Sequence, residues 1–513
     1  MRHLIGLDVG TTGVKTILVD ERGTVLASAF EAYPLSTPSP NWAEQDPADW
    51  WRATVETLQD VVTASQVDPA TIAGIGLSGQ MHSSVLLDEH DQVLRPSILW
   101  CDTRTTAQCR WITETVGLDR LASYVSNPAL EGFTAPKLIW VRDHEPDVYH
   151  KIQHVILPKD YIRFKLTGVY AMEVSDAAGT LLFDVKNRRW SHELMHAIGL
   201  APEWMPPCYE SIDVCGTVTP AVAEATGLKA GTPVVGGGAD NTCGAVGNGI
   251  VRAGRVLSSL GTSGVVFAHT DDVRVDPDMR VHTFCHSVPH KWYLMGVTLF
   301  AGGSFRWYRD TLGELEVSMG RLANIDPYEL LTLEAERAPV GSEGLIFLPY
   351  LMGERTPHKD ANAKGMFFGL TGRHDRSHLI RSVIEGITYA MRDSLEIVRG
   401  LGLSIAQIRT TGGGARSPFW RQVQADIYGA EVVTINVAEG PAFGAAILAG
   451  VGTGLFTSVE EATDDLVRIV TRTEPNATAS SWYDRYYQVF KGLYPALKPS
   501  FDQVSDLVRA QTK

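Results

Sequence analysis

A single aspartate follows a run of glycines near the middle of the chain. The apolar segment 233–235 leads into 236–239 (GGGA), and Asp240 and Asn241 come next. Glycines at a strand end let the backbone approach a ligand closely. One aspartate placed there suffices as the general base for a hydroxyl that attacks a phosphoryl group. The alternative is an aspartate that caps a helix beginning near Thr242, which is a common structural role.

Two glycine-threonine segments occupy equivalent places in the two halves of the chain. Residues 8–15 (DVGTTGVK) and 260–264 (LGTSG) each predict a tight hairpin turn whose backbone N–H groups can approach a phosphate. Thr11 and Thr12 add hydroxyl donors. Asp8 would face that phosphate, which is tolerable only if a cation such as Mg²⁺ lies between them. Each segment alone is equally typical of a plain hairpin turn, but two facing turns would clamp a polyphosphate.

A third glycine-rich segment, 410–417 (TTGGGARS), ends a predicted strand and precedes a predicted helix at 418–428. Such a junction can admit a nucleotide against the helix N-terminus. The chain lacks the G-x-x-x-x-G-K-[ST] pattern, so a P-loop is excluded.

Polar and aromatic residues after the next strand could hold a substrate. Residues 79–82 (GQMH) follow the predicted strand 72–77, although a lone histidine or methionine more often has a structural role. Trp100 precedes Asp102 and Arg104. This group suits stacking on a sugar and binding its hydroxyls, or the two charged residues form a surface ion pair.

The elements around these motifs repeat. Strands at 4–9, 14–19 and 24–30 predict an antiparallel meander, followed by a helix at 47–64 with Trp51, Val55, Leu58 and Val62 on one face, and by strands at 72–77 and 84–87. Strands at 255–259, 265–269 and 291–299 predict a second meander. We therefore expect two duplicated domains with a boundary near 246–254, and a final amphipathic helix over 480–510 that covers the second domain.

Size and composition limit the function classes. The 513 residues exceed one ordinary core, and the net charge of −14 disfavours nucleic acid and membrane surfaces as partners. Six scattered cysteines without metal-site or redox spacing suit a reducing compartment, the cytoplasm. No signal peptide or membrane helix is expected from the sequence.

Together these motifs resemble the FGGY family of carbohydrate kinases, within the actin, hexokinase and heat-shock ATPase superfamily. The resemblance spans nearly the whole chain and includes segments at 132–138, 157–161, 175–180 and 353–358 that are similar to the branch acting on D-xylulose. It implies an α/β fold of two duplicated actin/hexokinase-like (ribonuclease H-like) ATPase domains, 1–248 and 249–513, around a central cleft. The first would hold the sugar, and the second would hold the nucleotide.

The resemblance also implies roles for residues. Asp240 would take the proton of the sugar 5-hydroxyl, which attacks the γ-phosphate of ATP, and Asp8 would organise Mg²⁺. Met81, His82, Asn241 and Trp100 are the sugar-binding candidates. The nucleotide candidates are Thr11, Thr12, Lys15, Gly261, Thr262, Gly302, Gly413 and Ser417. Ser83 departs from the glycine that many relatives carry there, which affects the expected shape of the sugar pocket.

The resemblance leaves other functions to weigh. Another kinase of the family would phosphorylate ribulose, gluconate or glycerol, and only pocket residues separate these enzymes. An actin-like structural ATPase would scatter light on polymerising with ATP, and a chaperone would need a further peptide-binding domain. A homodimer is a family expectation that the sequence does not test.

Overall fold

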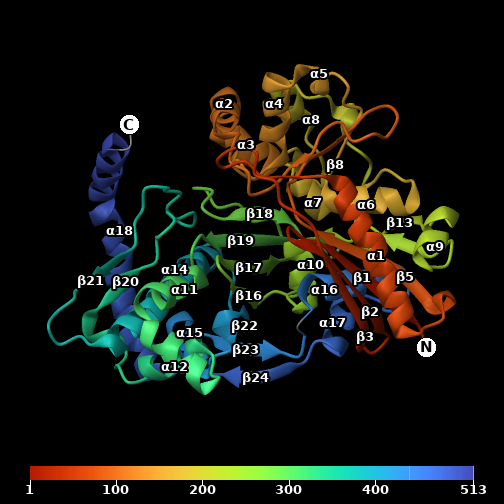
Figure 1. Ribbon diagram of the computed structural model, residues 1–513. Helices are drawn as coiled ribbons and strands as arrows, with labels where there is room; N and C mark the ends of the chain where they lie inside the picture. Colours follow the sequence, from red (N-terminus) through yellow and green to blue (C-terminus); the bar gives the residue numbers. More distant parts are fainter. Residues whose placement is uncertain (438, 512–513) are drawn as a thin grey trace.

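Two seven-stranded sheets form the centre of the computed structural model, which describes residues 1–437 and 439–511 (Figure 1). The first sheet has the order β13-β14-β5-β1-β2-β3, with β15 beside β5. These strands are β13 (Val214–Thr217), β14 (Pro233–Val235), β5 (Ile72–Gly79), β1 (His3–Val9), β2 (Gly13–Asp20), β3 (Val25–Ala32) and β15 (Gly238–Ala239).

The second sheet repeats the topology of the first. Its order is β18-β19-β17-β16-β22-β23-β24: β18 (His282–Cys285), β19 (Trp292–Thr298), β17 (Gly264–Thr270), β16 (Arg255–Leu260), β22 (Gln407–Gly412), β23 (Glu431–Ile435) and β24 (Ile469–Thr473). In each half an antiparallel three-strand meander is joined by a strand parallel to its first member, β5 to β1 and β22 to β16. The expected duplication is confirmed.

One predicted strand lies outside the main sheet. Residues 84–87 were expected to form the fifth strand of the first half, and β6 (Val85–Leu87) does form there, but it pairs with β8 (His154–Ile156) in a separate two-stranded sheet. Local sequence predicts an extended segment but not its partner, because pairing is decided by contacts distant in the chain.

The helices follow local sequence signals closely. They are α1 (Pro47–Ser65), α2 (Thr106–Val116), α3 (Leu118–Val125), α4 (Thr134–His144), α5 (Pro146–Tyr149), α6 (Pro158–Thr167), α7 (Val174–Ala178), α8 (His192–Ile198), α9 (Pro220–Thr226), α10 (Asp240–Gly247), α11 (Gly302–Leu312), α12 (Glu314–Ala323), α13 (Pro327–Ala335), α14 (Arg376–Gly400), α15 (Pro418–Tyr428), α16 (Gly440–Gly452), α17 (Val459–Leu466) and α18 (Ala477–Gln511). Asp46 caps α1 by accepting the Ala48 N–H at 2.9 Å. The buried residues of α1 include Trp50, Leu58 and Val61. Trp51 and Val62 of the predicted face are partly buried against the same core, so the buried face is rotated slightly from the predicted one.

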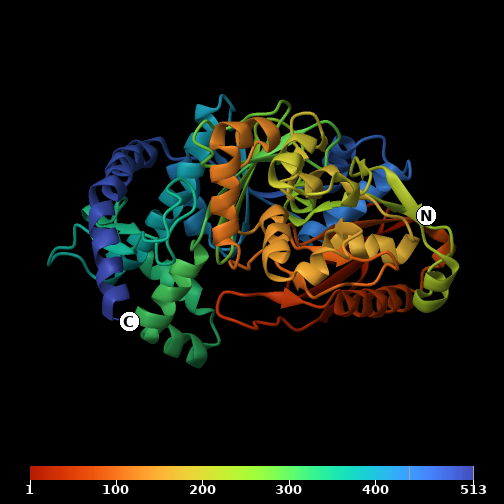
Figure 2. The same ribbon diagram turned by 90° about the horizontal axis from the view of Figure 1, so that it is seen from above.

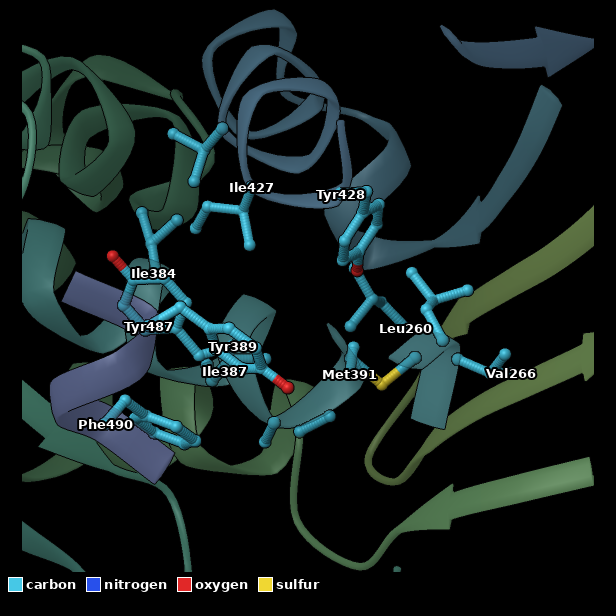
Figure 3. Close-up of a cluster of buried hydrophobic side chains, with 14 of the residues drawn as sticks. Leu260, Val266, Ile384, Ile387, Tyr389, Met391, Ile427, Tyr428, Tyr487 and Phe490 are labelled. Atoms are coloured by element: carbon cyan, nitrogen blue, oxygen red, sulfur yellow. The ribbon is translucent and has the colours of Figure 1, made fainter. Parts of the chain in front are cut away.

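One face of the second sheet packs against α14 and α15, and α18 packs against these two helices. Figure 3 shows Leu260 and Val266 of the strands facing Met391 of α14 and Tyr428 of α15, with Tyr487 and Phe490 of α18 behind. This contact confirms that the last helix covers the second half. Figure 2 shows α18 running along the outside of the molecule. Among the described helices, none combines the length and apolar character needed to cross a membrane.

The other face of the second sheet is covered by the first half. Leu257, Phe267 and Tyr293 belong to the same buried cluster as Phe133 and Phe183. Adjacent residues such as Val256 and Leu257 lie in different clusters, as expected for a strand with both faces buried. The two halves therefore share a hydrophobic core.

Helix α16 of the second half packs against the first sheet (Figure 1). A Cβ atom added at Gly6 would lie 1.9 Å from Ala442 O, and one at Gly76 would lie 1.9 Å from Ala445 O. On the same helix, a Cβ at Gly444 would lie 1.8 Å from Cys243 O of α10. Glycines are required at these positions because the backbones of the two halves touch.

Candidate active site

Three neighbouring parallel strands end at one edge of the first sheet. Strand β5 lies between β1 and β15, with Ser78 opposite both Asp8 and Gly238. Because parallel strands present their carboxyl ends at the same edge, the residues that follow them meet there. The structure thus brings together Asp8, Asp240 and the segment after Gly79.

Asp240 is the first residue of α10. Its carboxylate accepts the N–H of Asn241 at 2.7 Å, and the N-cap position belongs to Ala239, which makes no side-chain cap bond. The alternative in which Asp240 caps a helix starting near Thr242 is therefore wrong. Burial, with a smaller effect of the Asp8 charge, raises the pKa of Asp240 to about 7. The side chain can therefore exchange a proton near neutral pH.

Asp8 carries an unsatisfied oxygen. Its Oδ1 is buried and has no hydrogen-bond partner among the described residues. Burial raises the pKa of this carboxyl to about 6, although Ser78 and the Lys15 charge act in the opposite direction. A buried oxygen without a partner needs a ligand, because leaving it unpaired costs roughly 1–3 kcal/mol.

Asp8 fits a Mg²⁺ site. The ion prefers oxygen ligands and is commonly held by one or two carboxylates together with substrate phosphates and water. A cation held by Asp8 would satisfy its unpartnered Oδ1 and would offset the repulsion between Asp8 and Asp240. No group of three or more His, Cys, Asp or Glu side chains within 1–437 and 439–511 could form an all-protein metal site.

The first glycine-threonine turn is held by two glutamines: Gln45, which no sequence motif marked, and Gln80 of segment 79–82, which was expected to face a substrate. Gln45 Nε2 donates to Thr11 O at 2.7 Å, and Gln80 Nε2 donates to Gly10 O at 3.3 Å. Gln80 Nε2 also donates to Gln45 Oε1 at 3.1 Å. Thr12 is exposed. These hydrogen bonds fix the backbone of the turn, while the exposed side chain of Thr12 stays free for a ligand.

Lys15 lies in register with Asp8 on the neighbouring strand. Its ammonium pairs with the carboxylate of Glu439, directly before α16. A nucleotide contact by Lys15 would have to compete with this ion pair.

The sugar-binding candidates surround the end of β5. Met81 is buried, and the amide of Asn241 donates to its Sδ at 3.6 Å. Trp100 is 46% exposed, and its indole N–H donates to Thr11 Oγ1 at 2.9 Å. The departure at Ser83 has a structural consequence, because its hydroxyl accepts the Trp100 backbone N–H at 3.1 Å. The predicted sugar and phosphate sites therefore touch at Trp100 and Thr11.

His82 adopts an uncommon backbone conformation with φ of 69°. Its Nδ1 lies 2.5 Å from Gly179 O, and since a carbonyl can only accept, Nδ1 carries the proton. Burial lowers the pKa of His82 to about 3, and the charges of Lys137 and Arg355 add to the effect. Neutral His82 therefore keeps Nε2 as an acceptor.

Lys137 and Thr134 hold His82 in place. Lys137 Nζ and Thr134 Oγ1 both donate to His82 O at 2.9 Å, and Lys137 also donates to Gly132 O at 2.6 Å. Segment 132–138 stands out in the sequence only by its resemblance to the family, and no local pattern marks a buried lysine whose acceptors are backbone carbonyls.

Asp102 and Arg104 form a buried ion pair at 2.7 Å, so the expected surface pair is wrong. Asp102 also accepts the Ala43 N–H at 2.6 Å, and the Arg104 guanidinium lies 3.7 Å from the Trp42 ring centroid. Both side chains are occupied in packing this loop.

A separate pocket of about 830 Å³ lies in the second half. Its lining includes five predicted nucleotide candidates, Gly261, Thr262, Gly302, Gly413 and Ser417. Aromatic rings of Phe305, Tyr328 and Trp420 also line it. The first-half candidates Thr11, Thr12 and Lys15 are not among its lining residues. The pocket has the size and the mixed aromatic and polar lining typical of a small-molecule site.

Close backbone contacts form the wall of this pocket. Gly302 N–H donates to Gly261 O at 2.9 Å, and Gly412, at φ of 80°, leaves no room for a side chain beside Leu260 O. The Ser417 hydroxyl accepts the Trp420 N–H at 3.3 Å and thus caps α15.

The Gly302→Ala variant is expected to weaken nucleotide binding. The new Cβ would lie 2.4 Å from Gly261 O, so the turn must shift, at an overpacking cost of about 1–3 kcal/mol. We expect KM for ATP to rise about tenfold, with KM for the sugar changed less than twofold. Steady-state kinetics with Gly372→Ala as the control tests this, because a Cβ at Gly372 meets nothing within 4 Å. Equal KM values for ATP in both variants would contradict it.

Two family models match the chain. The N-terminal domain of the FGGY family of carbohydrate kinases matches residues 3–247, and the C-terminal domain of that family matches residues 256–453.

Individual proteins match over nearly their full length. A xylulose kinase from Bacillus subtilis (strain 168) is 43% identical over 498 residues, which cover 97% of this chain and 98% of that protein. One from Escherichia coli (strain K12) is 40% identical, covering 96% of this chain and 99% of that protein. The crystal structure of xylulose kinase from Rhodospirillum rubrum superposes with a TM-score of 0.91 at 32% identity, covering 98% of this chain and 100% of that chain.

Proposed function

Because the chain belongs to the FGGY family of carbohydrate kinases, we propose that it transfers the γ-phosphoryl group of ATP to the 5-hydroxyl of D-xylulose. The observation that carries the mechanism is the placement of Asp240 and Asp8 at the same edge of the first sheet, at the ends of the two strands that flank β5, with the pKa of Asp240 raised to about 7. The full-length similarity to xylulose kinases supports D-xylulose as the acceptor.

Asp240 is the proposed general base. As a carboxylate it accepts the proton when the O5–H bond of the sugar breaks, while O5 forms a bond to the γ-phosphorus and the bond to the ADP oxygen breaks. A base whose pKa lies near the working pH combines a populated carboxylate with strong proton affinity. The remaining barrier to phosphoryl transfer is lowered mainly by positioning and electrostatic stabilisation.

Asp8 is the proposed holder of Mg²⁺, through its unpartnered Oδ1. When bound, Mg²⁺ neutralises the charge that develops on the phosphoryl oxygens. The turn at Thr11 and Thr12 presents backbone and hydroxyl donors beside it, held in shape by Gln45 and Gln80.

Sugar recognition is assigned to the end of β5 and to α10. His82 Nε2 can accept from a sugar hydroxyl because Nδ1 carries the proton. The Asn241 amide can donate, and the half-exposed ring of Trp100 can stack on the sugar. ATP is assigned to the 830 Å³ pocket, through Gly261, Thr262, Gly302, Gly413 and Ser417. Closure of the two halves on both substrates would exclude water, which protects the γ-phosphate from hydrolysis.

The acceptor is tested by an assay that couples ADP release to NADH oxidation. We expect kcat/KM for D-xylulose to exceed that for L-ribulose, D-ribulose, glycerol and gluconate by at least about tenfold, since a missing or misplaced hydroxyl leaves buried polar groups unpaired. A higher value for another acceptor would keep the kinase chemistry and replace D-xylulose as the substrate. An actin-like structural ATPase is not favoured, because the family is one of carbohydrate kinases.

The proposal also covers the cellular location, the oligomeric state and the division into domains. A cytoplasmic location is supported by the sparse cysteine content, and the six cysteines are unpaired. A homodimer is an expectation from the family resemblance. The division into 1–248 and 249–513 is supported by the end of α10 at Gly247 and the start of β16 at Arg255, although α16 reaches back to the first sheet.

A further inference from the structure

The turn that carries Asp240 has almost no side chains of its own. Residues 236–239 are three glycines and an alanine, and Gly237 has φ of 71°. Glycine has the greatest backbone freedom of any residue, so this turn must be fixed by groups from elsewhere in the chain. The position of a proton acceptor matters greatly, because a misplacement of about 1 Å can lower a rate by about 10²-fold.

Ser175 of α7 holds the backbone of the residue before Asp240. Its buried hydroxyl oxygen accepts the N–H of Ala239, the residue directly before Asp240, at 3.0 Å. The same hydroxyl donates to Glu173 Oε1 at 2.7 Å. Glu173 is itself fixed by the backbone N–H groups of Ser175 and Asp176, at 2.7 and 2.8 Å.

The carbonyl of Ala239 is held by a second hydroxyl chain. Thr242 Oγ1 donates to Ala239 O at 2.9 Å, and Ser287 Oγ donates to Thr242 Oγ1 at 2.6 Å. Ser287 follows β18 of the second half, whereas Ser175 belongs to the first half. Thr242 Oγ1 also lies 3.1 Å from Ser175 Oγ, so the two hydroxyl chains are linked. Both polar groups of Ala239 are therefore held by side chains of the first half, and Ser287 supports Thr242 from the second half.

Buried charges fix the other end of the turn. Arg163 and Lys159 donate to Gly236 O at 2.8 and 3.4 Å. Both cations pair with Asp160 at 2.8 Å, and Lys159 lies 3.2 Å from Asp176. All these side chains are fully buried. A buried ion network contributes little net stability, because desolvation offsets the attraction between the charges.

We infer that Ser175 is a positioning residue for Asp240, acting through the Ala239 N–H, and that the Glu173–Lys159 cluster behind it keeps this hydroxyl oriented. The inference rests on the proposed role of Asp240. Ser175 does not itself touch the substrates. By holding the backbone at Ala239, it sets the direction from which the Asp240 carboxylate approaches the sugar hydroxyl.

The Ser175→Ala variant is expected to lower kcat about 10- to 100-fold, with KM for ATP unchanged within about twofold. Ser211→Ala is the matched control: its buried hydroxyl also donates to Glu173, at 3.0 Å, but makes no hydrogen bond to Ala239. We expect this control to retain kcat within about threefold.

A double variant separates positioning from general destabilisation. If Ser175 acts through Asp240, then Ser175→Ala lowers the residual kcat of Asp240→Asn by less than about twofold, because residues that act as a unit are not additive. An equal loss in both backgrounds would overturn the inference. So would a Ser175→Ala variant with the wild-type kcat.

Failure of the proposed function has a different signature. If Asp240→Asn keeps a near-normal kcat, the base assignment fails, whatever Ser175→Ala does. Should Ser175→Ala not fold, Ser175→Cys decides, because a thiol keeps a similar shape but is a much weaker hydrogen-bond acceptor for the Ala239 N–H. We expect it to lower kcat about 3- to 10-fold, again without effect in the Asp240→Asn background, and an unchanged kcat would overturn the inference.

Discussion

The Asp240→Asn variant is expected to lower kcat by about 10²- to 10⁴-fold, the range that general base catalysis contributes. Asparagine keeps the size of the side chain and an oxygen that can accept the Asn241 N–H, so the start of α10 is preserved. It removes only the capacity to take a proton. Coupled assays at high enzyme concentration measure the residual rate.

A second aspartate provides the control. Asp393 is also buried, and burial also raises its pKa to about 7, but its partner is Tyr487 at 2.7 Å in the contact between α14 and α18. The Asp393→Asn variant should keep kcat within about threefold if the effect depends on position at the active site. A comparable loss in both variants, or a near-normal rate for Asp240→Asn, would refute Asp240 as the base.

The same substitution has a thermodynamic consequence with a definite sign. The folded-state pKa of Asp240, about 7, lies above the ordinary 3.8, so the folded protein binds more protons than the unfolded chain between these values. Asp240 should therefore contribute stability below about pH 4 that is lost as pH rises to about 7, whereas buried histidines such as His82, whose pKa is lowered to about 3, contribute with the opposite sign. The difference in melting temperature between the wild-type protein and Asp240→Asn, both without ligands, should fall over this pH range.

The parts of this site that could be predicted are those whose structure is determined by neighbouring residues in the sequence. The hairpin turns at Gly10 and Gly261, the glycines before Asp240 and the helix after Ser417 each have their structural cause within a few residues. The duplication was visible because the two meanders repeat the same glycine pattern. These elements position most of the candidate residues.

Contacts between distant segments could not be predicted. Nothing around Ser175 indicates that its hydroxyl meets Ala239, 64 residues away. The buried pair of Asp102 and Arg104 looked like surface charges because their burial depends on Trp42 and Glu44. Likewise, the sequence places α16 in the second half, but its helix packs against β1 and β5 of the first.

The position of α16 bears on how the two halves work together. Its backbone touches that of the first sheet at Gly6 and Gly76 and that of α10 at Gly444. Helix α10 begins with Asp240, and Glu439 before α16 pairs with Lys15 beside Asp8. Asp8 and Asp240 are thus both connected to the packing of α16 against the first half.

The Asp8→Asn variant is expected to lower kcat/KM for Mg·ATP by about 10²- to 10³-fold, which corresponds to several kcal/mol of lost stabilisation of the phosphoryl charge. The neutral amide keeps the size of the side chain but is a much poorer ligand for Mg²⁺. Rates measured against Mg²⁺ concentration should show a weaker dependence on the metal than in the wild type. The Asp20→Asn control removes a buried carboxylate of the neighbouring strand that accepts only the Arg22 and Thr24 N–H groups, at 2.9 and 2.8 Å, and should keep the wild-type dependence on Mg²⁺.

The variant should also change the titration of its neighbour. The charge of Asp8 raises the pKa of Asp240, so removing it lets Asp240 ionise at a lower pH. In the protein without ligands, the fall in melting temperature that depends on Asp240, measured as Asp8→Asn minus the double variant Asp8→Asn/Asp240→Asn, should then end at a lower pH than the same difference measured with Asp8 present. An unchanged difference would mean that the two carboxylates are not electrostatically linked.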